Sequence, residues 1–479
     1  ETWSDSKKVF RYINRLSFVH PDFPMFVDCS IVKSSPRDRK FLKPTYTIDE
    51  ANLFNNPETY EIEIEIDNSK MEGVTSDVLQ KSIMKCIKFV LGGLQQTNYP
   101  ISYDIIGEVG KDYLKLIKNN SEYLKSNCFI GPNSYTLQME NIIEANDNNI
   151  PNIRENYTVT EKADGLRKLL YISKDGLVYL INTNMNIEFT GSKSGNSNYY
   201  NSIIDGEHIS HNKRGEFINL YAAFDIYFLK NNDVRAKKFI LNDPTKPNSD
   251  FRLSLLNDVI KDLQLTGIAN KKTPINIKAK TFYISQGDIT IFMACKQIID
   301  RINSGGFEYE TDGLIFTPSD YGAGLTKLNT QLKSVKVSWE YSLKWKPSYY
   351  NTIDFYVTTK KNETGSEIIG NIFESGHNST SLSQINQYKT LVLRVGFDEK
   401  KDGYINPCLD VINDNLPSTY NQENTDGYKP TPFYPTNPYD ANAHVCNIML
   451  KKDNNGTLQM ITEENEVFID NTIVEFSYD

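Results

Sequence analysis

Residues 157–172 of the chain read YTVTEKADGLRKLLYI. The apolar runs Tyr157–Thr160 and Lys168–Ile172 are typical of strands, and Asp164-Gly165 between them is typical of a turn. A Lys-x-Asp-Gly match by itself would be an ordinary charged β-turn. Here Lys162 stands at the end of a predicted strand, where a rigid backbone can direct its amine into a cleft. We therefore predict that Lys162 is a functional side chain.

Further charged motifs follow along the chain, each beside or inside an apolar run. They are Ile203-Ile204-Asp205-Gly206-Glu207, Phe224-Asp225-Ile226, Glu310–Phe316 with Asp312 near its start, and Leu343-Lys344-Trp345-Lys346-Pro347, which leads into Asn351–Phe355. Because side chains alternate along a strand, Asp205 and Glu207 share one face, and Lys344 and Lys346 share another. Singly, Asp-Gly pairs favour turns and a Lys-x-Lys strand favours a solvated face. Their order and spacing together indicate one site.

In this order and spacing, the motifs resemble those of the covalent nucleotidyltransferase superfamily, which includes mRNA capping enzymes and polynucleotide ligases. The resemblance covers roughly Phe129 to Phe355. It implies that Lys162 is the catalytic nucleophile, and Glu207 and Asp312 are the candidate ligands of a divalent metal, Mg²⁺ or Mn²⁺. The residues implied for GTP binding are Arg167 and Glu207 near the ribose, Phe224 against the base, Asp225 orienting neighbouring groups, and Lys344 and Lys346 at the α-phosphate.

The chemistry of these residue types fits that resemblance. A free lysine amine has a pKa near ~10.4, so at neutral pH it is protonated and is not a nucleophile. Burial and neighbouring cations favour the neutral amine, and Lys344 and Lys346 would supply such cations. The same two lysines would offset charge that develops on the α-phosphate during an in-line displacement. Attack by Lys162 would release pyrophosphate and leave a phosphoramidate.

A second acidic pattern lies near the start of the chain. In Tyr60–Ile66, Glu61, Glu63 and Glu65 fall on one strand face, roughly 7 Å apart, with isoleucines on the other. A half-exposed amphipathic strand would explain the alternation, but three like charges in a row repel unless a cation compensates. The pattern resembles an acidic strand of the tunnel-type, metal-dependent RNA triphosphatases. That resemblance makes the three glutamates candidate metal ligands.

Basic residues accompany these acids on neighbouring predicted strands. Arg11 and Arg15 share a face of the first strand, and Lys33 follows Asp28 on the next. They are candidate contacts of a triphosphate, and ordinary surface charge is the alternative interpretation.

Composition limits the class of protein. The formal net charge of −9 over 479 residues disfavours a general nucleic-acid coat, although it allows an enzyme that binds one phosphate-bearing end in a local basic cleft. The six cysteines and five histidines are scattered and have no zinc spacing, so we expect neither a structural zinc site nor disulfides. No apolar run reaches ~18 residues, and we expect a soluble intracellular chain.

These observations predict an α+β multidomain protein. We expect part of a β-tunnel triphosphatase domain over residues 1–118, a linker over 119–128, a mixed α/β nucleotidyltransferase domain with antiparallel sheets over 129–350, and an OB-fold domain, incomplete, over 351–479. This order resembles the multifunctional capping enzymes of large nucleocytoplasmic DNA viruses of the asfarvirus, poxvirus and mimivirus types. That resemblance implies a location inside the host cell, in the cytoplasm (a viral factory), or in the virion. Tunnel triphosphatases use a second acidic strand near their N-terminus, and no such strand precedes Glu1. The last basic motif of the transferases would follow Asp479, so we expect a piece of a longer protein. A methyltransferase domain or subunit is the partner that such proteins imply.

Three functions remain open at this point. The first is a guanylyltransferase that moves GMP from GTP to the diphosphate 5′ end of nascent mRNA. The second is an ATP-dependent polynucleotide ligase with the same lysine chemistry, which would not need the tunnel domain. The third is a non-catalytic module that binds RNA ends, against which the complete set of charged motifs argues. Labelling with GTP and with ATP separates them.

Overall fold

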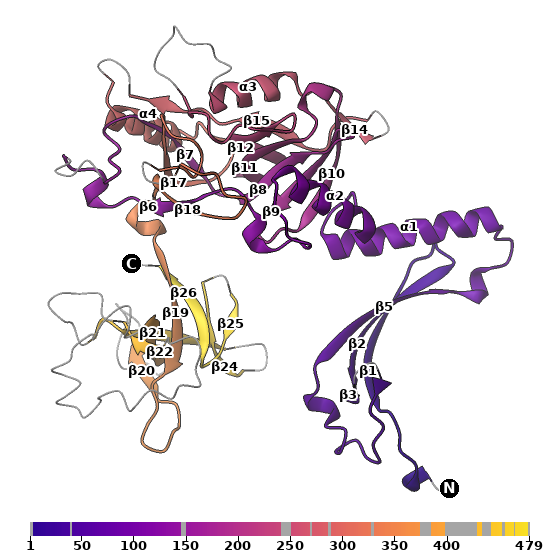
Figure 1. The fold of residues 1–479 in the computed structure, drawn as a ribbon. Coiled ribbons are helices and arrows are strands. Elements are labelled where there is room, and N and C mark those ends of the chain that lie inside the picture. Colours follow the sequence, from indigo (N-terminus) through magenta and orange to yellow (C-terminus); the bar gives the residue numbers. More distant parts are fainter. Residues whose placement is uncertain are drawn as a thin grey trace. The chain divides into compact units, whose positions relative to one another are not determined.

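The computed structural model describes residues 3–38, 41–144, 150–240, 251–268, 271–285, 289–326, 330–373, 385–397, 429–433, 442–452, 456–463 and 465–477. The chain divides into two compact units, Glu1–Trp345 and Lys346–Asp479 (Figure 1). No helix in the described part is long and apolar enough to cross a membrane.

The N-terminal part of the first unit contains an antiparallel three-stranded sheet in the order β1-β2-β5. Its strands are β1 (Arg11–Val19), β2 (Met25–Ser34) and β5 (Glu58–Ile66), and a separate ribbon pairs β3 (Arg37–Asp38) with β4 (Phe41–Leu42). The register pairs Ser17 with Asp28 and Asp28 with Glu63, so the charged residues gather on one face. On the opposite face Leu16, Phe18 and Tyr60 are more than half exposed. Among the described residues no further strand pairs with this sheet, and the tunnel stays a prediction.

Two helices follow this sheet (Figure 1). Helix α1 (Ser76–Gln95) begins where the Thr75 hydroxyl accepts a hydrogen bond from the Val78 amide, and it ends at Gln96 in a left-handed conformation (φ 51°). Helix α2 (Tyr103–Leu116) buries Tyr113, which packs edge-on against Tyr171 of the large sheet at 6.2 Å between ring centroids. Helix α2 therefore contributes to the same hydrophobic core as that sheet.

The large sheet has eight strands and supports one side of the candidate site. In sheet order they are β13 (Asn232–Asp233), β12 (Phe217–Leu229), β11 (Ser202–His211), β8 (Leu166–Ile172), β9 (Leu177–Asn182), β10 (Ile187–Ser194) and β14 (Leu265–Gly267), with β15 (Asn276–Ala279) parallel to β12. Helix α2 packs on one face through a core that includes Leu169 and Tyr171. Helix α3 (Arg252–Asp262) packs on the other through a core that includes Leu170 and Ile172. Alternation along β8 thus supplies both faces.

A five-stranded sheet supports the other side of the site. Its order is β16 (Tyr283–Ile284), β7 (Tyr157–Ala163), β17 (Thr311–Pro318), β18 (Ser338–Trp345) and β6 (Asn133–Thr136), and α4 (Ile291–Asn303) packs beside β7 and β16. Strands β7 and β8 are consecutive along the chain yet belong to different sheets. The turn Asp164-Gly165 therefore carries the chain from one sheet to the other, and Lys162 and Arg167 lie on either side of that crossing.

The second unit contains one further sheet with the order β25-β24-β23-β21-β19-β26. The strands are β19 (Thr352–Thr359), β20 (Ile369–Phe373), β21 (Ile385–Phe397), β22 (Lys429–Pro432), β23 (Val445–Lys452), β24 (Leu458–Ile461), β25 (Val467–Phe468) and β26 (Thr472–Ser477), of which β20 and β22 pair with β21 off the main path. Phe355, Val357 and Leu391 are central in its core. The predicted mixture of few helices and mostly antiparallel sheets is confirmed, whereas the OB-fold assignment stays a prediction.

Candidate active site

A cavity of about 660 Å³ lies between the two sheets of the first unit. Its walls come from β6, β7, β17 and β18 on one side and from β8, β11, β12 and the end of β15 on the other. The charged and aromatic side chains that line it and concern the chemistry are Lys162, Arg167, Glu207, Phe224, Asp225, Lys280 and Lys344. The fold thus brings together side chains that are up to 182 residues apart, from Lys162 to Lys344, at one cavity.

Lys162 lies near the end of β7 and is held by one acid. Its ammonium group is 2.8 Å from both carboxylate oxygens of Asp312. Strand β17 pairs Gly313 with Lys162 and Thr311 with Ala163, so the register shifts at Asp312, and this irregularity places the carboxylate over the lysine. Lys162 is partly exposed and also lines the cavity, so its amine lies where a bound molecule could reach it.

Arg167 is fixed by a buried carboxylate. Asp205, which is fully buried, accepts hydrogen bonds from Arg167 at 2.5 Å and 3.2 Å and from the Tyr227 hydroxyl at 2.6 Å. The Pro132 carbonyl accepts a further hydrogen bond from the guanidinium at 2.9 Å. The sequence predicts that Asp205 shares a strand face with Glu207 and predicts no function for it. In the structure, Asp205 is the residue that orients Arg167.

Glu207 has a different environment although it lies only two residues away. It is half-buried and lines the cavity, and its carboxylate makes no hydrogen bond or ion pair with another described residue. Burial raises its pKa to about 7, and the neighbouring cations Lys280, Arg167 and Lys162 oppose that rise. A carboxylate with unused acceptor capacity, surrounded by cations and facing a cavity, can bind hydroxyl groups or a metal ion.

Phe224 and Asp225 are adjacent on β12, but their side chains contact different parts of the protein. Phe224 lines the cavity with its ring centroid 5.6 Å from the Arg167 guanidinium carbon. Asp225 is buried and pairs with Arg252 of α3 through two hydrogen bonds of 2.8 Å and 3.1 Å. Burial raises the pKa of Asp225, and the charge and hydrogen bonds of Arg252 oppose the rise. Asp225 thereby ties α3 to the strand that carries Phe224.

The two predicted phosphate-binding lysines are not equivalent. Lys344 pairs with Ile315 on β17 and lines the cavity. Strand β18 ends at Trp345, and Lys346 lies beyond it and is not among the residues that line the cavity. The structure therefore places Lys344 at the cavity that Lys162 and Arg167 line, and Lys346 is the first residue of the second unit.

Lys280 was missed by the sequence analysis. It follows β15, its amide donates to the Ala223 carbonyl at 2.8 Å, and its buried ammonium group donates to the Glu161 carbonyl and lies 3.4 Å from the Glu161 carboxylate. Tyr309 and Thr160 hold that carboxylate with hydrogen bonds of 2.8 Å and 2.9 Å. No local motif marks Lys280, because only the long-range pairing of β15 with β12 brings it to the cavity. The alternation of Lys278 and Lys280 was the one available signal.

The acidic face of the N-terminal sheet is only partly as predicted. Carboxylate oxygens of Asp28, Glu63 and Glu65 lie within 4.8 Å of one another, and this group could hold a metal ion. Arg15 contacts Asp28 at 2.8 Å and Glu63 at 2.7 Å. Of the predicted ligands, Glu61 instead pairs with Arg11 at 2.7 Å. The sequence analysis did not include Asp28 among the acids of this face.

Lys33 does not join this group. It donates to the Phe54 carbonyl at 2.7 Å and lies 3.6 Å from Glu58. Because it is an odd number of residues from Asp28 on the same strand, it points to the other face of the sheet.

Comparison with known proteins shows which family and which proteins this chain resembles. Residues 107–337 match the family described as "mRNA capping enzyme, catalytic domain". The chain is 26% identical over 428 residues to a probable mRNA-capping enzyme of Acanthamoeba polyphaga mimivirus, an alignment that covers 82% of this chain and 32% of that protein. It is 25% identical over 221 residues to an mRNA-capping enzyme of Danio rerio, covering 44% of this chain and 33% of that protein.

The chain thus spans about a third of the length of the curated relatives it matches. A solved structure titled Pmar-Lig_PreS3 covers 68% of this chain and 72% of its own at 14% identity, with a TM-score of 0.28, which is too low to bear on the fold. The resemblance to mRNA capping enzymes that the motifs predicted is confirmed.

Proposed function

We propose that this chain catalyses mRNA guanylyl transfer, with Lys162 as the residue that carries GMP. The observation that carries the proposal is the position of Lys162, whose amine faces a cavity together with Arg167, Glu207 and Lys344. Lys162, Arg167 and Glu207 lie inside the segment 107–337 that matches the capping-enzyme family. The substrates would be GTP and the diphosphate 5′ end of nascent mRNA. A methyltransferase domain or subunit would act on the product.

In the first half-reaction the Lys162 nitrogen attacks the α-phosphorus of GTP. A nitrogen–phosphorus bond forms, the bond from the α-phosphorus to the β-phosphate oxygen breaks, and pyrophosphate leaves with that electron pair. The amine must be neutral to attack, and Asp312, 2.8 Å away, is the acceptor in place for its proton. Lys344 would offset the charge on the non-bridging oxygens of the α-phosphate.

In the second half-reaction a terminal oxygen of the RNA 5′-diphosphate attacks the same phosphorus. The nitrogen–phosphorus bond breaks, the lysine nitrogen regains a proton, and the RNA carries a GpppRNA cap. Arg167 and Glu207 would hold the ribose while Phe224 stacks on the base. Lys280, which points toward the same cavity, would add positive charge to its wall.

A divalent cation fits the donor set of this cavity. Glu207 has free acceptor capacity and Asp312 lies beside the nucleophile, and Mg²⁺ is typically bound by one or two carboxylates together with substrate phosphates. When bound there, the ion would neutralise phosphate charge. These two residues would hold it.

We also propose that the N-terminal sheet takes part in an RNA 5′-triphosphatase site. The convergence of Asp28, Glu63 and Glu65, with Arg15 in contact with two of them, supports this function. Carboxylates suit Mg²⁺ or Mn²⁺, and an arginine suits a phosphate. Release of γ-phosphate from triphosphate-ended RNA, with Glu63→Ala as the inactive variant, tests it. Equal turnover by that variant would contradict the assignment.

The direct test of guanylyl transfer is labelling of the protein with GTP and with ATP in parallel. We expect a covalent adduct from GTP that resists denaturation and alkali and is lost in acid. Lys162→Ala should form none, whereas Lys174→Ala, which removes an exposed lysine paired with Asp112, should label normally. Labelling by ATP alone would favour a ligase, and labelling by neither nucleotide would favour a non-catalytic module.

A further inference from the structure

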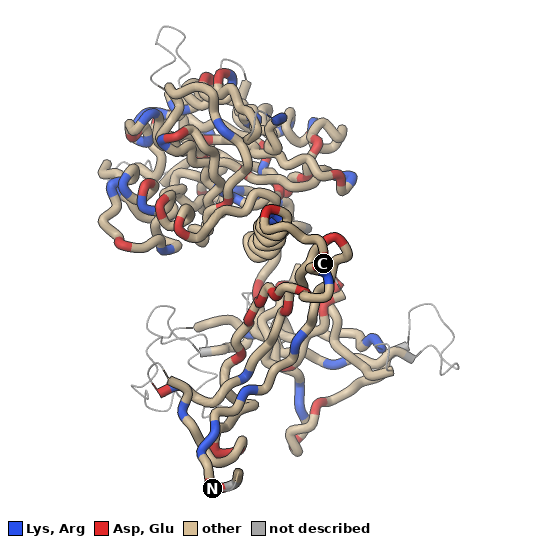
Figure 2. Tube along the Cα trace, turned by 90° about the vertical axis from the view of Figure 1, so that its right-hand side faces the viewer, with Lys and Arg blue, Asp and Glu red and all other residues tan. Residues whose placement is uncertain are grey.

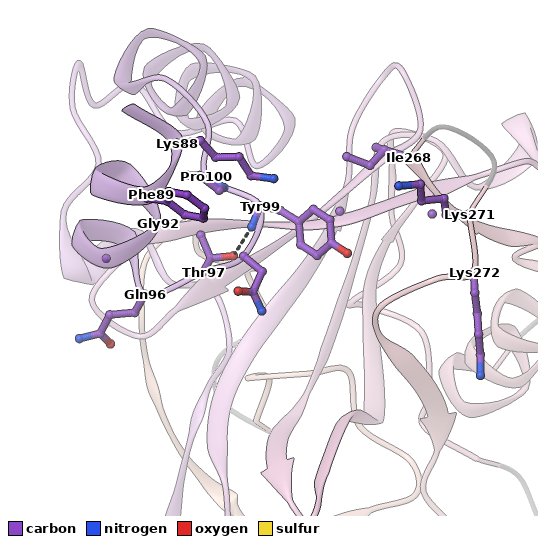
Figure 3. A pocket seen from close by; sticks show the side chains of 14 residues that line it. Lys88, Phe89, Gly92, Gln96, Thr97, Tyr99, Pro100, Ile268, Lys271 and Lys272 are labelled. Carbon is purple, nitrogen blue, oxygen red and sulfur yellow. Dashed lines mark hydrogen bonds between the residues drawn. The ribbon is translucent and has the colours of Figure 1, made fainter. Parts of the chain in front are cut away.

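A second cavity, of about 720 Å³, lies away from the active site (Figure 3). It is lined by the C-terminal end of α1, the segment from Gln96 to Pro100, Gly191 of β10, and Gly267, Ile268, Lys271 and Lys272. None of the residues that the proposed guanylyl transfer uses lines this cavity.

Its wall is built by specific contacts. The Gln95 side chain donates to the Ile101 carbonyl at 2.7 Å and accepts from the Ile101 amide at 3.1 Å, which fixes the segment after α1. Gly191 has a φ of 76°, and a side chain there would come within 2.5 Å of the Tyr99 ring, so glycine lets that ring lie against β10. The Gly267 amide donates to the Lys271 carbonyl at 2.7 Å and ties Lys271 to the end of β14.

The lining carries positive charge without a matching acid. Lys88, Lys271 and Lys272 line the cavity, and no Asp or Glu does. None of these three lysines forms a salt bridge with a described residue, whereas Lys168 of the large sheet pairs with Glu188 at 2.8 Å. Figure 3 shows Lys88 and Lys271 extending toward one another from opposite sides of the Tyr99 ring. Along the rest of the chain Lys and Arg are interspersed with Asp and Glu (Figure 2).

We propose that this cavity binds single-stranded RNA a few nucleotides downstream of the 5′ end that is being capped. Lysines along an open groove with exposed aromatic rings are the features by which proteins bind RNA strands without base-specific contacts. Lys88, Lys271 and Lys272 contact phosphates, and Tyr99 and the exposed Phe89 offer surfaces on which bases stack. The inference rests on the proposed function for the identity of the ligand as RNA.

The position of the cavity suits an RNA strand that leaves the active site. Tyr99 packs on the core that includes Tyr171, and Arg167 lies on the same face of β8 as Tyr171 because the two are four residues apart. Strand β14 is three strands from β8, about 15 Å across the sheet, and its Gly267 is level with Ile172, which is about 17 Å along β8 from Arg167. The two sites are therefore roughly 22 Å apart. Several nucleotides of extended RNA cover that distance.

RNA binding by the purified chain tests the proposal. A fluorescent single-stranded RNA of about 20 nucleotides, longer than one such site, is titrated by anisotropy at several salt concentrations. The combined variant Lys88→Ala, Lys271→Ala, Lys272→Ala should bind at least ~10-fold more weakly, and its slope of log affinity against log salt should be smaller by about 2. The control Lys213→Ala, Lys261→Ala, Lys296→Ala removes three exposed lysines elsewhere in the same unit and should bind as the unaltered chain does. Equal affinity and slope in the two variants would overturn the proposal.

Two further readouts locate the contact. RNA that contains 4-thiouridine should crosslink to the peptide with Phe89 and Tyr99, and crosslinks confined to other peptides would overturn the proposal. Inorganic tripolyphosphate should compete poorly with the RNA, since competition as strong as that of RNA would show a site for small anions instead. Adduct formation from GTP should be unchanged in the lysine variant. Because RNA binding needs no GTP, a chain that forms no adduct but binds RNA through these lysines would refute the guanylyl transfer and leave this site standing.

Discussion

The transferase cavity and the N-terminal sheet both bring acids and bases together, but they do so in different surroundings. Around the cavity, Asp205, Asp225 and Glu161 are buried and each is saturated by defined donors, and the Glu207 carboxylate has no partner among the described residues. In the sheet β1-β2-β5 every residue of β1 is exposed, and Arg11 and Glu61 meet in solvent. The buried acids around the cavity therefore have fixed partners and keep the site in shape. The exposed charges of the N-terminal sheet need a bound ligand to hold them in place.

Apart from Lys162, replacement of Lys344 should have the largest effect among the cavity variants. Lys344→Ala should slow adduct formation by ~100-fold, because it removes a positive charge that offsets charge developing at the phosphate. Lys344→Arg should restore only part of the rate, since a planar guanidinium cannot replace a compact ammonium. Rapid-quench measurement of the enzyme–GMP adduct gives the rate.

Lys346→Ala is the matched comparison. The sequence predicts equal effects from the two lysines, whereas Lys346 does not line the cavity, so we expect a smaller loss from its replacement. A Lys344→Ala protein that reacts at the normal rate would show that both lysines are solvated surface charges.

Asp205 tests whether a saturated, buried acid positions a substrate contact. Asp205→Asn removes the charge that orients Arg167, and we expect the KM for GTP to rise by ~10-fold or more with a smaller change in kcat, along with a loss of about 3 kcal/mol in unfolding free energy. Steady-state kinetics and urea unfolding measure both. The control Asp175→Asn alters an exposed acid and should change neither. An unchanged KM in a destabilised protein would reduce Asp205 to a structural residue.

Replacement of Glu207 should raise stability while it lowers activity, whereas replacement of Asp205 should lower stability and weaken the use of GTP. Its folded pKa of about 7 lies above the ordinary 4.5, so between these values the folded chain keeps a proton that the unfolded chain releases, and stability falls as the pH rises through this range. Glu207→Gln should therefore gain about 1–3 kcal/mol of unfolding free energy at pH 8 relative to the unaltered chain and nothing at pH 4. Adduct formation should decline. Unfolding curves at the two pH values measure this, and a variant less stable at pH 8 would contradict it.

The smallest effect belongs to the N-terminal sheet. The Arg11–Glu61 pair is 41% and 38% exposed at its two side chains, and exposed pairs contribute little. We expect Arg11→Ala to change the unfolding free energy by less than ~0.5 kcal/mol, and the change should shrink further at high salt. A loss of unfolding free energy several times larger would mean that ion pairs hold this sheet together.

The same contrast explains what the sequence could predict. Lys162, Arg167 and Lys344 stand in strands whose alternation and turns are local, so their positions could be predicted without a structure. Lys280, Asp28 and the positioning role of Asp205 could not, because each depends on which strands pair over long distances: β15 with β12, β2 with β5, and β8 with β11. Lys33 was assigned to the acidic group from its order along the chain, but its odd separation from Asp28 points it to the other face.

The fold class was predictable for a similar reason. Alternating short strands and two-residue turns predict antiparallel sheets from local sequence alone, and the core of the transferase unit follows from these runs. The assignment of consecutive strands β7 and β8 to different sheets was not predictable, because both are largely buried on both faces. That assignment nevertheless creates the cavity.

The most direct test of the central claim is to identify the residue that carries the nucleotide. The chain is incubated with GTP and a divalent cation, digested at alkaline pH, and its peptides are analysed by mass spectrometry. The account predicts a GMP adduct on Lys162 and on no other residue, formed from GTP and not from ATP. An adduct on Lys280 or Lys344, or one that persists in Lys162→Ala, would contradict it.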